Sequence, residues 1–272
     1  MLTSDSWAIS AWDTLMTLFE WAYTYASCED NILETTNTFL KLGFVIHLTK
    51  SVLIPKQELE FLGFLLNSNS MTIRLPRRKA INVREACENL LNQSNPTIRE
   101  VAQVIGLLVS SLPGVQFGEL HYRHLERNRI LALKANKGDY DAPMNLRTKA
   151  RSELHWWVTN LNTAFKNIMH TNPDLTLTTD ASNTRWGVVC EGQQTGGLWS
   201  AKEHCFHINY LEMKAVLFGL KSLCSDLTDK HMRIQADNTT TVSYINAVGG
   251  IKSIDCNDMV LQIWQWANSR NI

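Results

Sequence analysis

Apolar residues recur at helical spacing in the first part of the chain. The spacing predicts helices over 30–42, 78–91, 98–112, 118–135 and 146–161. Gly43 and Pro113 directly follow two of these segments, at positions where helices commonly end. Thr97 precedes a third segment and Glu100 follows it by three residues, which predicts a capping box. The middle of the chain is therefore predicted to be helical.

Short runs rich in β-branched and aromatic residues lie between the first two helical segments. They predict strands over 44–48, 51–54, 59–66 and 71–75. Pro55 interrupts these runs, and the turn-forming residues Asn-Ser-Asn-Ser at 67–70 separate the last two. Pro76 ends the final run. Together these features predict a pair of β-hairpins.

Beyond residue 173 apolar and polar positions alternate. Leu175 and Leu177 face one side of a predicted strand, whereas Asp180 and the intervening threonines face the other. Further strands are predicted over 186–191, 197–200 and 232–237, and helices over 209–224, 239–247 and 256–267. The loop 170–174 separates this region from the helical one, so we place a domain boundary there. The order of elements predicts a mixed α/β fold.

The overall composition is that of a folded protein without net charge. Of the 272 residues, 44% are hydrophobic, which is enough to form a buried core. Because 26 Lys and Arg residues balance 26 Asp and Glu residues, the total charge does not indicate a nucleic-acid partner, and any basic surface must be local. No apolar run reaches the ~18 residues of a membrane span, and residues 1–10 lack the basic start of a secretory signal. We expect an intracellular protein, cytoplasmic or nuclear, without a membrane partner or a small-molecule cofactor.

Several cysteine, histidine and tryptophan residues have simple interpretations. The six cysteines include no Cys-x-x-Cys pair, which predicts reduced, buried thiols rather than disulfides or a zinc ribbon. The cluster His-Cys-Phe-His at 204–207 lacks a second pair of ligands, so we interpret it as surface or core residues instead of a metal site. Tryptophans at 156, 157, 264 and 266 have apolar neighbours and are predicted to lie in the core, with stacking on bases as the alternative.

Three carboxylates occupy positions that are unfavourable for folding alone. Asp180 and Asp237 each end a predicted strand on the face opposite its apolar residues. Glu212 shares a helical stripe with Val216 and Gly219, so it points toward a face that the helix buries. The free-energy cost of placing carboxylates at these positions would disappear if the three converged on divalent cations, because Mg²⁺ prefers oxygen ligands. Two such ions can activate a water molecule for attack on a phosphodiester.

Each of these carboxylates also has an ordinary structural interpretation. Asp180 and Asp237 fit turn or cap residues that follow strands, and Glu212 fits the far half of a capping box begun by Asn209. The residues taken singly leave both interpretations open.

Motifs around the carboxylates resemble those of type 1 ribonuclease H in content, order and approximate spacing. They are Thr179-Asp180-Ala181-Ser182, Trp186-Gly187-Val188-Val189, Asn209-Tyr210-Leu211-Glu212-Met213-Lys214-Ala215 and Ala236-Asp237-Asn238. Finer features resemble DIRS-type retrotransposons, which encode a tyrosine recombinase. These are His207-Ile208-Asn209, Leu217-Phe218-Gly219-Leu220, Asp237-Asn238-Thr239-Thr240 and Tyr244-Ile245-Asn246 before Gly249-Gly250. The resemblance spans roughly residue 27 to the end.

This resemblance implies a metal-dependent nuclease that hydrolyses the RNA strand of an RNA/DNA hybrid. In such enzymes the acids that match Asp180, Glu212 and Asp237 hold two Mg²⁺ ions, with Mn²⁺ as the alternative cation. Asn209 resembles a position that contacts hybrid bases in the minor groove, although a helix N-cap is a compatible role. Candidates for contacts with sugar or phosphate are Ser182 and Asn238.

An upstream part of the chain resembles the end of a reverse transcriptase palm. The matching residues are Leu-Gly-Phe-Val-Ile-His at 42–47, Lys50-Ser51 and Glu-Phe-Leu-Gly-Phe at 60–64, the last being similar to a primer-grip hairpin. There Gly63 would let the backbone approach nucleic acid closely. The helices that follow correspond to a thumb and connection. Candidates for phosphate contacts are Arg74, Arg77, Arg78 and Lys79, with a solvated basic turn as the alternative.

The chain departs from the family at both ends. A Tyr-x-Asp-Asp hairpin with the polymerase metal ligands would precede residue 27, yet residues 1–30 contain no Asp-Asp pair, so polymerase activity is not expected. The family's last strand and helix bring a fourth carboxylate and commonly a histidine, and the chain stops before them. The expected parts are an unassigned segment 1–26, a palm remnant with primer-grip-like hairpins over 27–76, a helical thumb and connection over 77–170, and a C-terminally truncated ribonuclease H-like domain over 174–272.

Two functions are compatible with the sequence. The first is a metal-dependent ribonuclease acting on RNA/DNA hybrids. The second is a catalytically inactive nucleic-acid-binding fragment of a degenerate retrotransposon. Resemblance to the family does not separate them.

Overall fold

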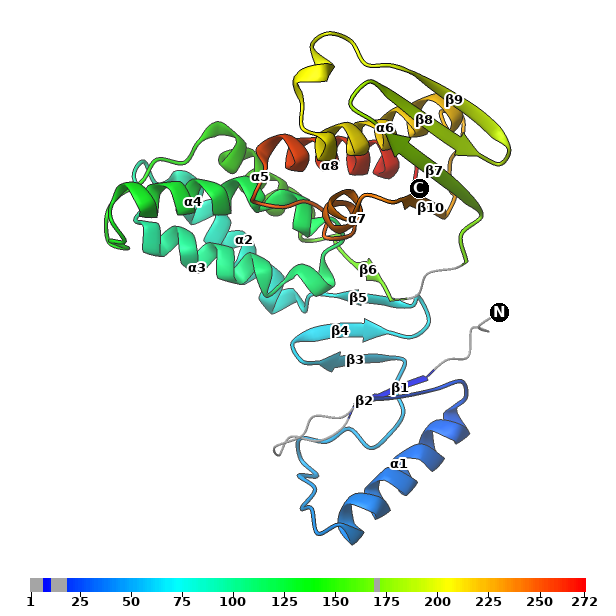
Figure 1. Ribbon diagram of the computed structural model, residues 1–272. Helices are drawn as coiled ribbons and strands as arrows, with labels where there is room; N and C mark the ends of the chain where they lie inside the picture. The colour runs from blue at the N-terminus through cyan, green and yellow to red at the C-terminus, as the bar shows by residue number, and fades with distance from the viewer. Residues whose placement is uncertain (1–6, 11–18, 169–171) are drawn as a thin grey trace. The chain divides into compact units, whose positions relative to one another are not determined.

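The computed structural model describes residues 7–10, 19–168 and 172–272, which fold into two compact units (Figure 1). The first unit comprises the chain up to Asn92 together with Gly106–Gln116 and His155–His170. The second comprises Gln93–Ile105, Phe117–Leu154 and Thr171–Ile272. Each unit contains helices and a sheet of its own, so the predicted mixed α/β fold class is confirmed.

The first unit contains α1 (Tyr25–Lys41), which has clear local signals at both ends. Thr24 and Ser27 form a reciprocal cap, because the hydroxyl of each accepts a hydrogen bond from the backbone N–H of the other, at 3.2 and 3.1 Å. Gly43 follows the helix with φ of +83°, a left-handed conformation that glycine adopts without strain. The helix predicted over 30–42 is confirmed, with an earlier start.

The strands predicted over 44–48 and 51–54 are wrong, because this segment forms a loop. A turn interrupts it, in which the Lys50 and Ser51 N–H groups donate to the His47 carbonyl at 3.0 and 3.1 Å. Val45 is 81% exposed, so its β-branched side chain gains no packing from a sheet. Strand propensity depends on such packing, and the sequence pattern does not reveal its absence.

The sheet of the first unit has the antiparallel order β3-β4-β5-β6. Its strands are β3 (Glu58–Phe61), β4 (Phe64–Asn67), β5 (Thr72–Arg74) and β6 (Lys166–Asn167). A separate hairpin pairs β1 (Trp7–Ser10) with β2 (Phe19–Ala22). The run predicted over 59–66 is two strands, because Leu62 and Gly63 have φ of 48° and 73° and close a two-residue hairpin turn.

The predicted helices of the middle region are present. They are α2 (Arg77–Asn92), α3 (Ile98–Val109), α4 (Arg123–Ala135) and α5 (Thr148–Asn160), with short 3-10 helices η1 (Leu112–Gly114) and η2 (Gly118–His121). The capping box before α3 is confirmed, since Glu100 accepts from the Thr97 N–H at 2.7 Å and Thr97 Oγ1 accepts in return at 3.2 Å. The single helix predicted over 118–135 is broken where Tyr122 leaves helical geometry, with φ of −146°.

The sheet of the second unit has the order β10-β7-β8-β9 (Figure 1). Its strands are β7 (Leu175–Ala181), β8 (Arg185–Cys190), β9 (Gln193–Leu198) and β10 (Met232–Ala236), of which β10 runs parallel to β7 and the others pair antiparallel. The strand predicted over 197–200 begins earlier than expected. Glu191 and Gly192, with φ of 47° and 80°, form a tight turn that brings Gln193 opposite Cys190.

Three helices accompany this sheet: α6 (Ile208–Leu223), α7 (Thr239–Asn246) and α8 (Ile254–Asn268), with a 3-10 turn η3 (Glu203–Cys205) before α6. Residues of α6 and α8 share one hydrophobic core with Leu177 and Val188 of the sheet. Gly219 permits the close contact of α6 with the sheet, because a Cβ built there would lie 2.5 Å from Val188 Cγ1. The alternation of β7 is confirmed, with Leu177 and Thr179 buried and Thr178 and Asp180 exposed.

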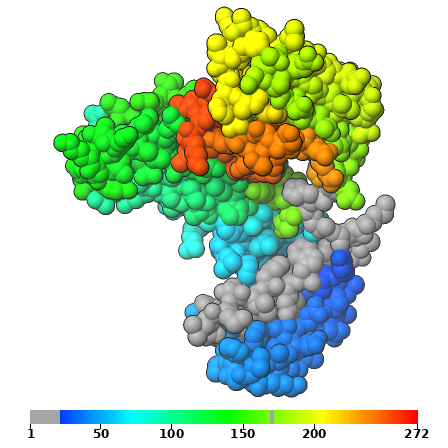
Figure 2. Space-filling model, viewed as in Figure 1, coloured from blue at the N-terminus to red at the C-terminus, as the bar shows by residue number. Residues whose placement is uncertain are grey.

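Helix α4 belongs to the same compact unit and binds the connection between α7 and α8. Arg123 and Arg127 donate to the carbonyls of Ala247 and Ile251 at 3.2 and 2.9 Å. Lys149 of α5 forms an ion pair of 2.6 Å with Asp258 of α8. Figure 2 shows the red-orange C-terminal residues packed against the green helices of this unit. The C-terminal sheet therefore does not form a compact unit alone.

Most of the predicted N-terminal segment 1–26 lies outside the described residues, and the predicted domain boundaries stay predictions. Within the described part of the chain, no helix combines the length and apolarity that crossing a membrane requires. All six cysteines are free thiols, and five are buried as predicted, whereas Cys205 is exposed. Trp157 and Trp266 lie in the core, as predicted.

Candidate metal centre

Asp180 and Asp237 are brought together by the pairing of two parallel strands. Thr179 of β7 and Ala236 of β10 are partners in the ladder, so the residue after each leaves the same end of the sheet. Both carboxylates are exposed, in agreement with the polar face that the alternation of β7 predicts. Asp237 directly follows β10, whereas Asp180 lies one residue before the end of β7.

Glu212 completes the group from the first turns of α6. Its side chain is only 4% exposed, in line with the apolar stripe on which it lies. One carboxylate oxygen from each of Asp180, Glu212 and Asp237 lies within 4.8 Å of the other two. The predicted convergence of the three carboxylates is therefore present in the folded chain.

The group carries an excess of negative charge. Burial, followed by the carboxylates of Asp237 and Asp180, raises the pKa of Glu212 to about 7, and a hydrogen bond from the Ala181 backbone opposes this rise. Glu212 Oε2 is buried without a hydrogen-bond partner in the described structure. None of the described Lys or Arg side chains forms an ion pair with the three acids. Such an arrangement suits a bound cation, which would neutralise the charge and bind the orphaned oxygen.

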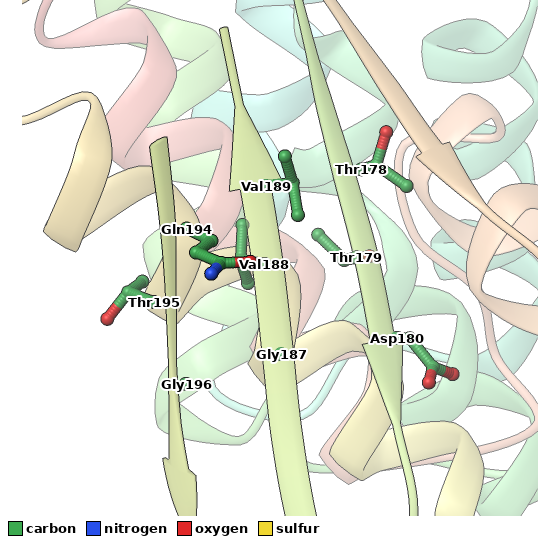
Figure 3. Close-up of a pocket in the computed structure, with 9 residues that line it drawn as sticks. All are labelled: Thr178, Thr179, Asp180, Gly187, Val188, Val189, Gln194, Thr195 and Gly196. Carbon is green, nitrogen blue, oxygen red and sulfur yellow. The ribbon is translucent and has the colours of Figure 1, made fainter. Parts of the chain in front are cut away.

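A hollow lies beside the group on the open face of the sheet. Figure 3 shows Asp180 and Thr178 on the same side of β7, with Gly187 on the adjacent strand β8 and Gly196 on β9 beyond it. The strand register places Asp180 opposite Gly187, and Gly187 opposite Gly196. Because neither glycine has a side chain, the surface of the sheet is flat along the line of aligned residues from Asp180 to Gly196. In the sequence the only sign of a role for Gly196 is its place as a glycine near a predicted strand.

The chain is similar to solved structures of a viral protease-reverse transcriptase. No protein-family model matches the chain, and no curated protein matches it. Similar solved structures include a foamy viral protease-reverse transcriptase with RNA/DNA hybrid, with 14% identity and a TM-score of 0.45, covering 93% of this chain and 34% of that one. The same protein with double-stranded DNA has 16% identity and a TM-score of 0.43, with coverages of 92% and 50%. The chain thus spans between a third and a half of these structures, and the case for the site is its own geometry.

The candidate nucleic-acid residues of the C-terminal region lie next to the carboxylates in sequence and are held by hydrogen bonds. Ser182 Oγ accepts from the N–H groups of Thr184 and Arg185, at 3.2 and 3.1 Å, in the turn after β7. Asn238 caps α7, and its Nδ2 donates to Asn209 Oδ1 at 3.1 Å. These contacts give the turn and the two asparagines defined positions.

The capping roles considered for Asn209, Glu212 and Asp237 are wrong. The N-cap of α6 is His207, whose Nδ1 accepts from the Asn209 N–H at 3.2 Å, so Asn209 does not cap the helix and Glu212 does not complete a capping box. The cap of α7 is Asn238 rather than Asp237. Because other side chains perform the capping, the carboxylates are left without that role.

The remaining candidates belong to the first compact unit. Gly63 lies in the β3–β4 turn with open space around its Cα, and Arg77 and Arg78 are exposed at the start of α2. Lys79 is engaged within the unit, since Nζ donates to the Ser110 carbonyl at 2.9 Å and lies 4.2 Å from the centroid of the Phe64 ring. Burial lowers the pKa of Lys79. Of these basic residues, Arg77 and Arg78 are the better placed to meet a phosphate.

The two histidines of the cluster at 204–207 contact two different elements. His207 caps α6, and His204 contacts the turn between β7 and β8. His204 Nδ1 lies 2.9 Å from the Asn183 carbonyl of the β7–β8 turn. Trp199 Nε1 donates to the Ser182 carbonyl in the same turn at 2.8 Å. The turn that follows Asp180 is thus held by two side chains that are distant from it along the chain, so no local sequence pattern indicates these contacts.

Proposed function

We propose that the second compact unit is a divalent-metal-dependent nuclease that hydrolyses the RNA strand of RNA/DNA hybrids. The observation that carries the proposal is the convergence of Asp180, Glu212 and Asp237 within 4.8 Å. Two of these acids come from adjacent strands and the third from a helix packed against them. The sequence motifs that surround them supply the substrate class.

Asp180, Glu212 and Asp237 would hold the metal, as Mg²⁺ or Mn²⁺. The fit rests on the hard oxygen donors, on the buried and unpartnered Glu212 Oε2, and on the raised pKa of Glu212. When bound there, such ions would supply activation of water and stabilisation of the leaving oxygen of a phosphodiester. The β7–β10 register and the packing of α6 hold the carboxylates in place beforehand.

Other residues of the chain would bind the hybrid. Asn209 would contact base edges in the minor groove, and Ser182 and Asn238 would face sugar or phosphate. In the first unit, Gly63 and the basic residues Arg77, Arg78 and Lys79 would contact the nucleic-acid backbone. Two observations support this role. No atom lies within 4 Å of the Cβ position at Gly63, and the side chains of Arg77 and Arg78 are exposed.

We further infer that the chain derives from a DIRS-type retrotransposon polyprotein. The support is the wording of its motifs, such as Leu217-Phe218-Gly219-Leu220 in α6 and Asp237-Asn238-Thr239-Thr240 after β10. Residues 27–76 would then be a palm remnant. We propose no polymerase activity for this chain, because residues 1–30 contain no Asp-Asp pair.

The test is cleavage of a hybrid labelled on its RNA strand by the 272-residue chain, with Mg²⁺ and with Mn²⁺. We expect cleavage of the RNA strand that falls at least about a hundredfold in Asp180→Asn and Asp237→Asn, because loss of a metal ligand removes several kcal/mol of transition-state stabilisation. Asp226→Asn is the matched control, since Asp226 is exposed and lies outside the group.

The outcomes separate the two functions. Cleavage that Asp237→Asn leaves unchanged means that the assigned site is wrong. If the chain binds the hybrid but neither metal supports cleavage, the catalytically inactive nucleic-acid-binding protein is the correct description.

A further inference from the structure

Asn209 and Asn238 are joined side chain to side chain beside the metal centre. Asn209 is the second residue of α6 and lies three positions before Glu212, whereas Asn238 directly follows Asp237. Their amides are linked by one hydrogen bond, from Asn238 Nδ2 to Asn209 Oδ1 at 3.1 Å. Both residues are half-buried, so the bond is partly shielded from bulk water.

The orientation of both amides follows from a backbone donor. The Thr241 N–H can only donate, and it donates to Asn238 Oδ1 at 2.8 Å as the N-cap bond of α7. Asn238 must therefore direct Nδ2 toward Asn209, which in turn must present Oδ1. The Nδ2 atom of Asn209 carries two N–H groups, and neither has a hydrogen-bond acceptor among the described residues.

The backbone of Asn209 is held as well. His207, the N-cap of α6, accepts the Asn209 N–H at 3.2 Å through Nδ1. Asn209 is thus fixed at its main chain by His207 and at its side chain by Asn238. A side chain held in this way loses little conformational entropy when it binds.

We propose that Asn238 is a positioning residue, which holds the Asn209 amide with Nδ2 outward so that Asn209 acts only as a hydrogen-bond donor toward acceptor atoms in the minor groove of the hybrid. The proposal rests on the proposed function for its substrate. It adds the selection of one orientation of the Asn209 amide by the α7 cap. It also replaces the direct contact of Asn238 with sugar or phosphate, because the oxygen and the nitrogen of the Asn238 amide are engaged by Thr241 and Asn209.

A fixed donor suits recognition that is independent of sequence. The minor groove presents purine N3 and pyrimidine O2 as acceptors at every base pair, and the RNA strand adds 2′-hydroxyl oxygens. An Asn209 amide that could rotate by about 180° would present its oxygen for about half of the time. That oxygen would be repelled by the acceptor atoms of the groove. The Asn238 bond removes that orientation.

Asn238→Ser tests the proposal, because serine retains the N-cap of α7 without charge but has no donor that reaches Asn209. Hybrid affinity is measured for the full chain in Ca²⁺, which occupies oxygen sites while cleavage is suppressed. We expect the Kd to rise about three- to tenfold, the usual effect of losing one neutral hydrogen bond. The melting temperature and its increase with Ca²⁺ should match those of the unmodified chain, which excludes damage to the fold or to Asp237.

A double-mutant cycle shows whether Asn238 acts through Asn209. In an Asn209→Ala background, Asn238→Ser should change the Kd by less than about twofold. Equal losses in both backgrounds, or no loss in the unmodified chain, would overturn the proposal. Hybrids with 3-deazapurines, or with 2′-fluoro RNA, identify which acceptor is contacted, since the effect of Asn238→Ser should vanish when that acceptor is removed. An undiminished effect in both would assign the contact to pyrimidine O2.

Side-chain amide NMR separates this proposal from the proposed function. Without nucleic acid, the Asn209 amide should be ordered in the unmodified chain and mobile in Asn238→Ser. Equal order in the two proteins would mean that Asn238 does not position Asn209. If the order differs as expected but the unmodified chain does not bind the hybrid, the proposed function fails while the positioning contact stands.

Discussion

Thr179 and Ala236 are partners in the parallel ladder of β7 and β10, so Asp180 and Asp237, which follow them, emerge side by side at one end of the sheet. Asp180 and Asp237 form a group of three carboxylates with Glu212. Two consequences for stability follow from this arrangement, one involving metal and one involving pH.

Divalent cations should stabilise the folded chain through these three acids. At a Mg²⁺ or Mn²⁺ concentration about ten times the Kd, ligand linkage predicts about 1.4 kcal/mol, or a rise in melting temperature of about 3–5 °C. Asp237→Asn should remove most of that rise, because it removes one ligand. Calorimetry with and without metal measures both values. An Asp226→Asn chain should respond like the unmodified one, and an equal rise in Asp237→Asn would place the metal elsewhere.

Glu212 should make the metal-free chain less stable as the pH rises. Its pKa in the folded chain is about 7, above its ordinary value of 4.5, so the folded state favours the protonated form. The stabilisation is fully present below pH 4.5 and is lost as the pH rises through 7. The expected loss is on the order of 2 kcal/mol. Urea unfolding in EDTA at pH 5 and pH 8 measures it.

The matched variant for this measurement is Glu212→Gln, which cannot ionise. The difference in unfolding free energy between pH 5 and pH 8 should shrink by the contribution of Glu212, while that of other groups remains. If both chains lose the same stability over this interval, Glu212 does not titrate as proposed.

Gly219→Ala should destabilise the second unit by about 1–3 kcal/mol, because the new methyl group would lie 2.5 Å from Val188 Cγ1 in a packed core. Gly106→Ala is the matched control, since Gly106 is an exposed helical glycine with no atom near its Cβ position, and it should stabilise by about 0.5–1 kcal/mol. Chemical denaturation measures both. Val188→Ala should partly rescue Gly219→Ala, and additivity of the two losses would show that the contact is not the cause.

Glu153 caps the start of α4 from a neighbouring helix. Its carboxylate accepts from the His124 and Leu125 N–H groups at 3.0 and 2.8 Å, and the side chain is buried. Burial raises its pKa to about 8, which these two hydrogen bonds oppose. Glu153→Ala should cost about 1–3 kcal/mol at pH 7, because both donors lose their acceptor. An exposed Glu85→Ala change should cost far less in the same urea titration, and similar costs would argue against the capping role.

Local sequence patterns determined most of the elements. The helical spacing of apolar residues predicted α2, α3 and α6, and the alternation in β7 predicted that Asp180 faces away from Leu177. These predictions succeed because the period of a helix or strand decides which side chains share a face, and neighbouring residues alone set that period.

The long-range arrangement was decided by tertiary structure. The loop at 44–54 has strand propensity but no strand, and β9 begins where a tight turn places it. The polar face of Asp180 follows from its own strand. Its closeness to Asp237, however, follows from the β7–β10 register, and its closeness to Glu212 follows from the packing of α6 on the sheet, where Gly219 meets Val188. Likewise the hydrogen bond from Asn238, the N-cap of α7, to Asn209 of α6 joins two helices that are distant in the sequence. Such contacts depend on strand pairing and core packing between distant segments, for which no local period exists.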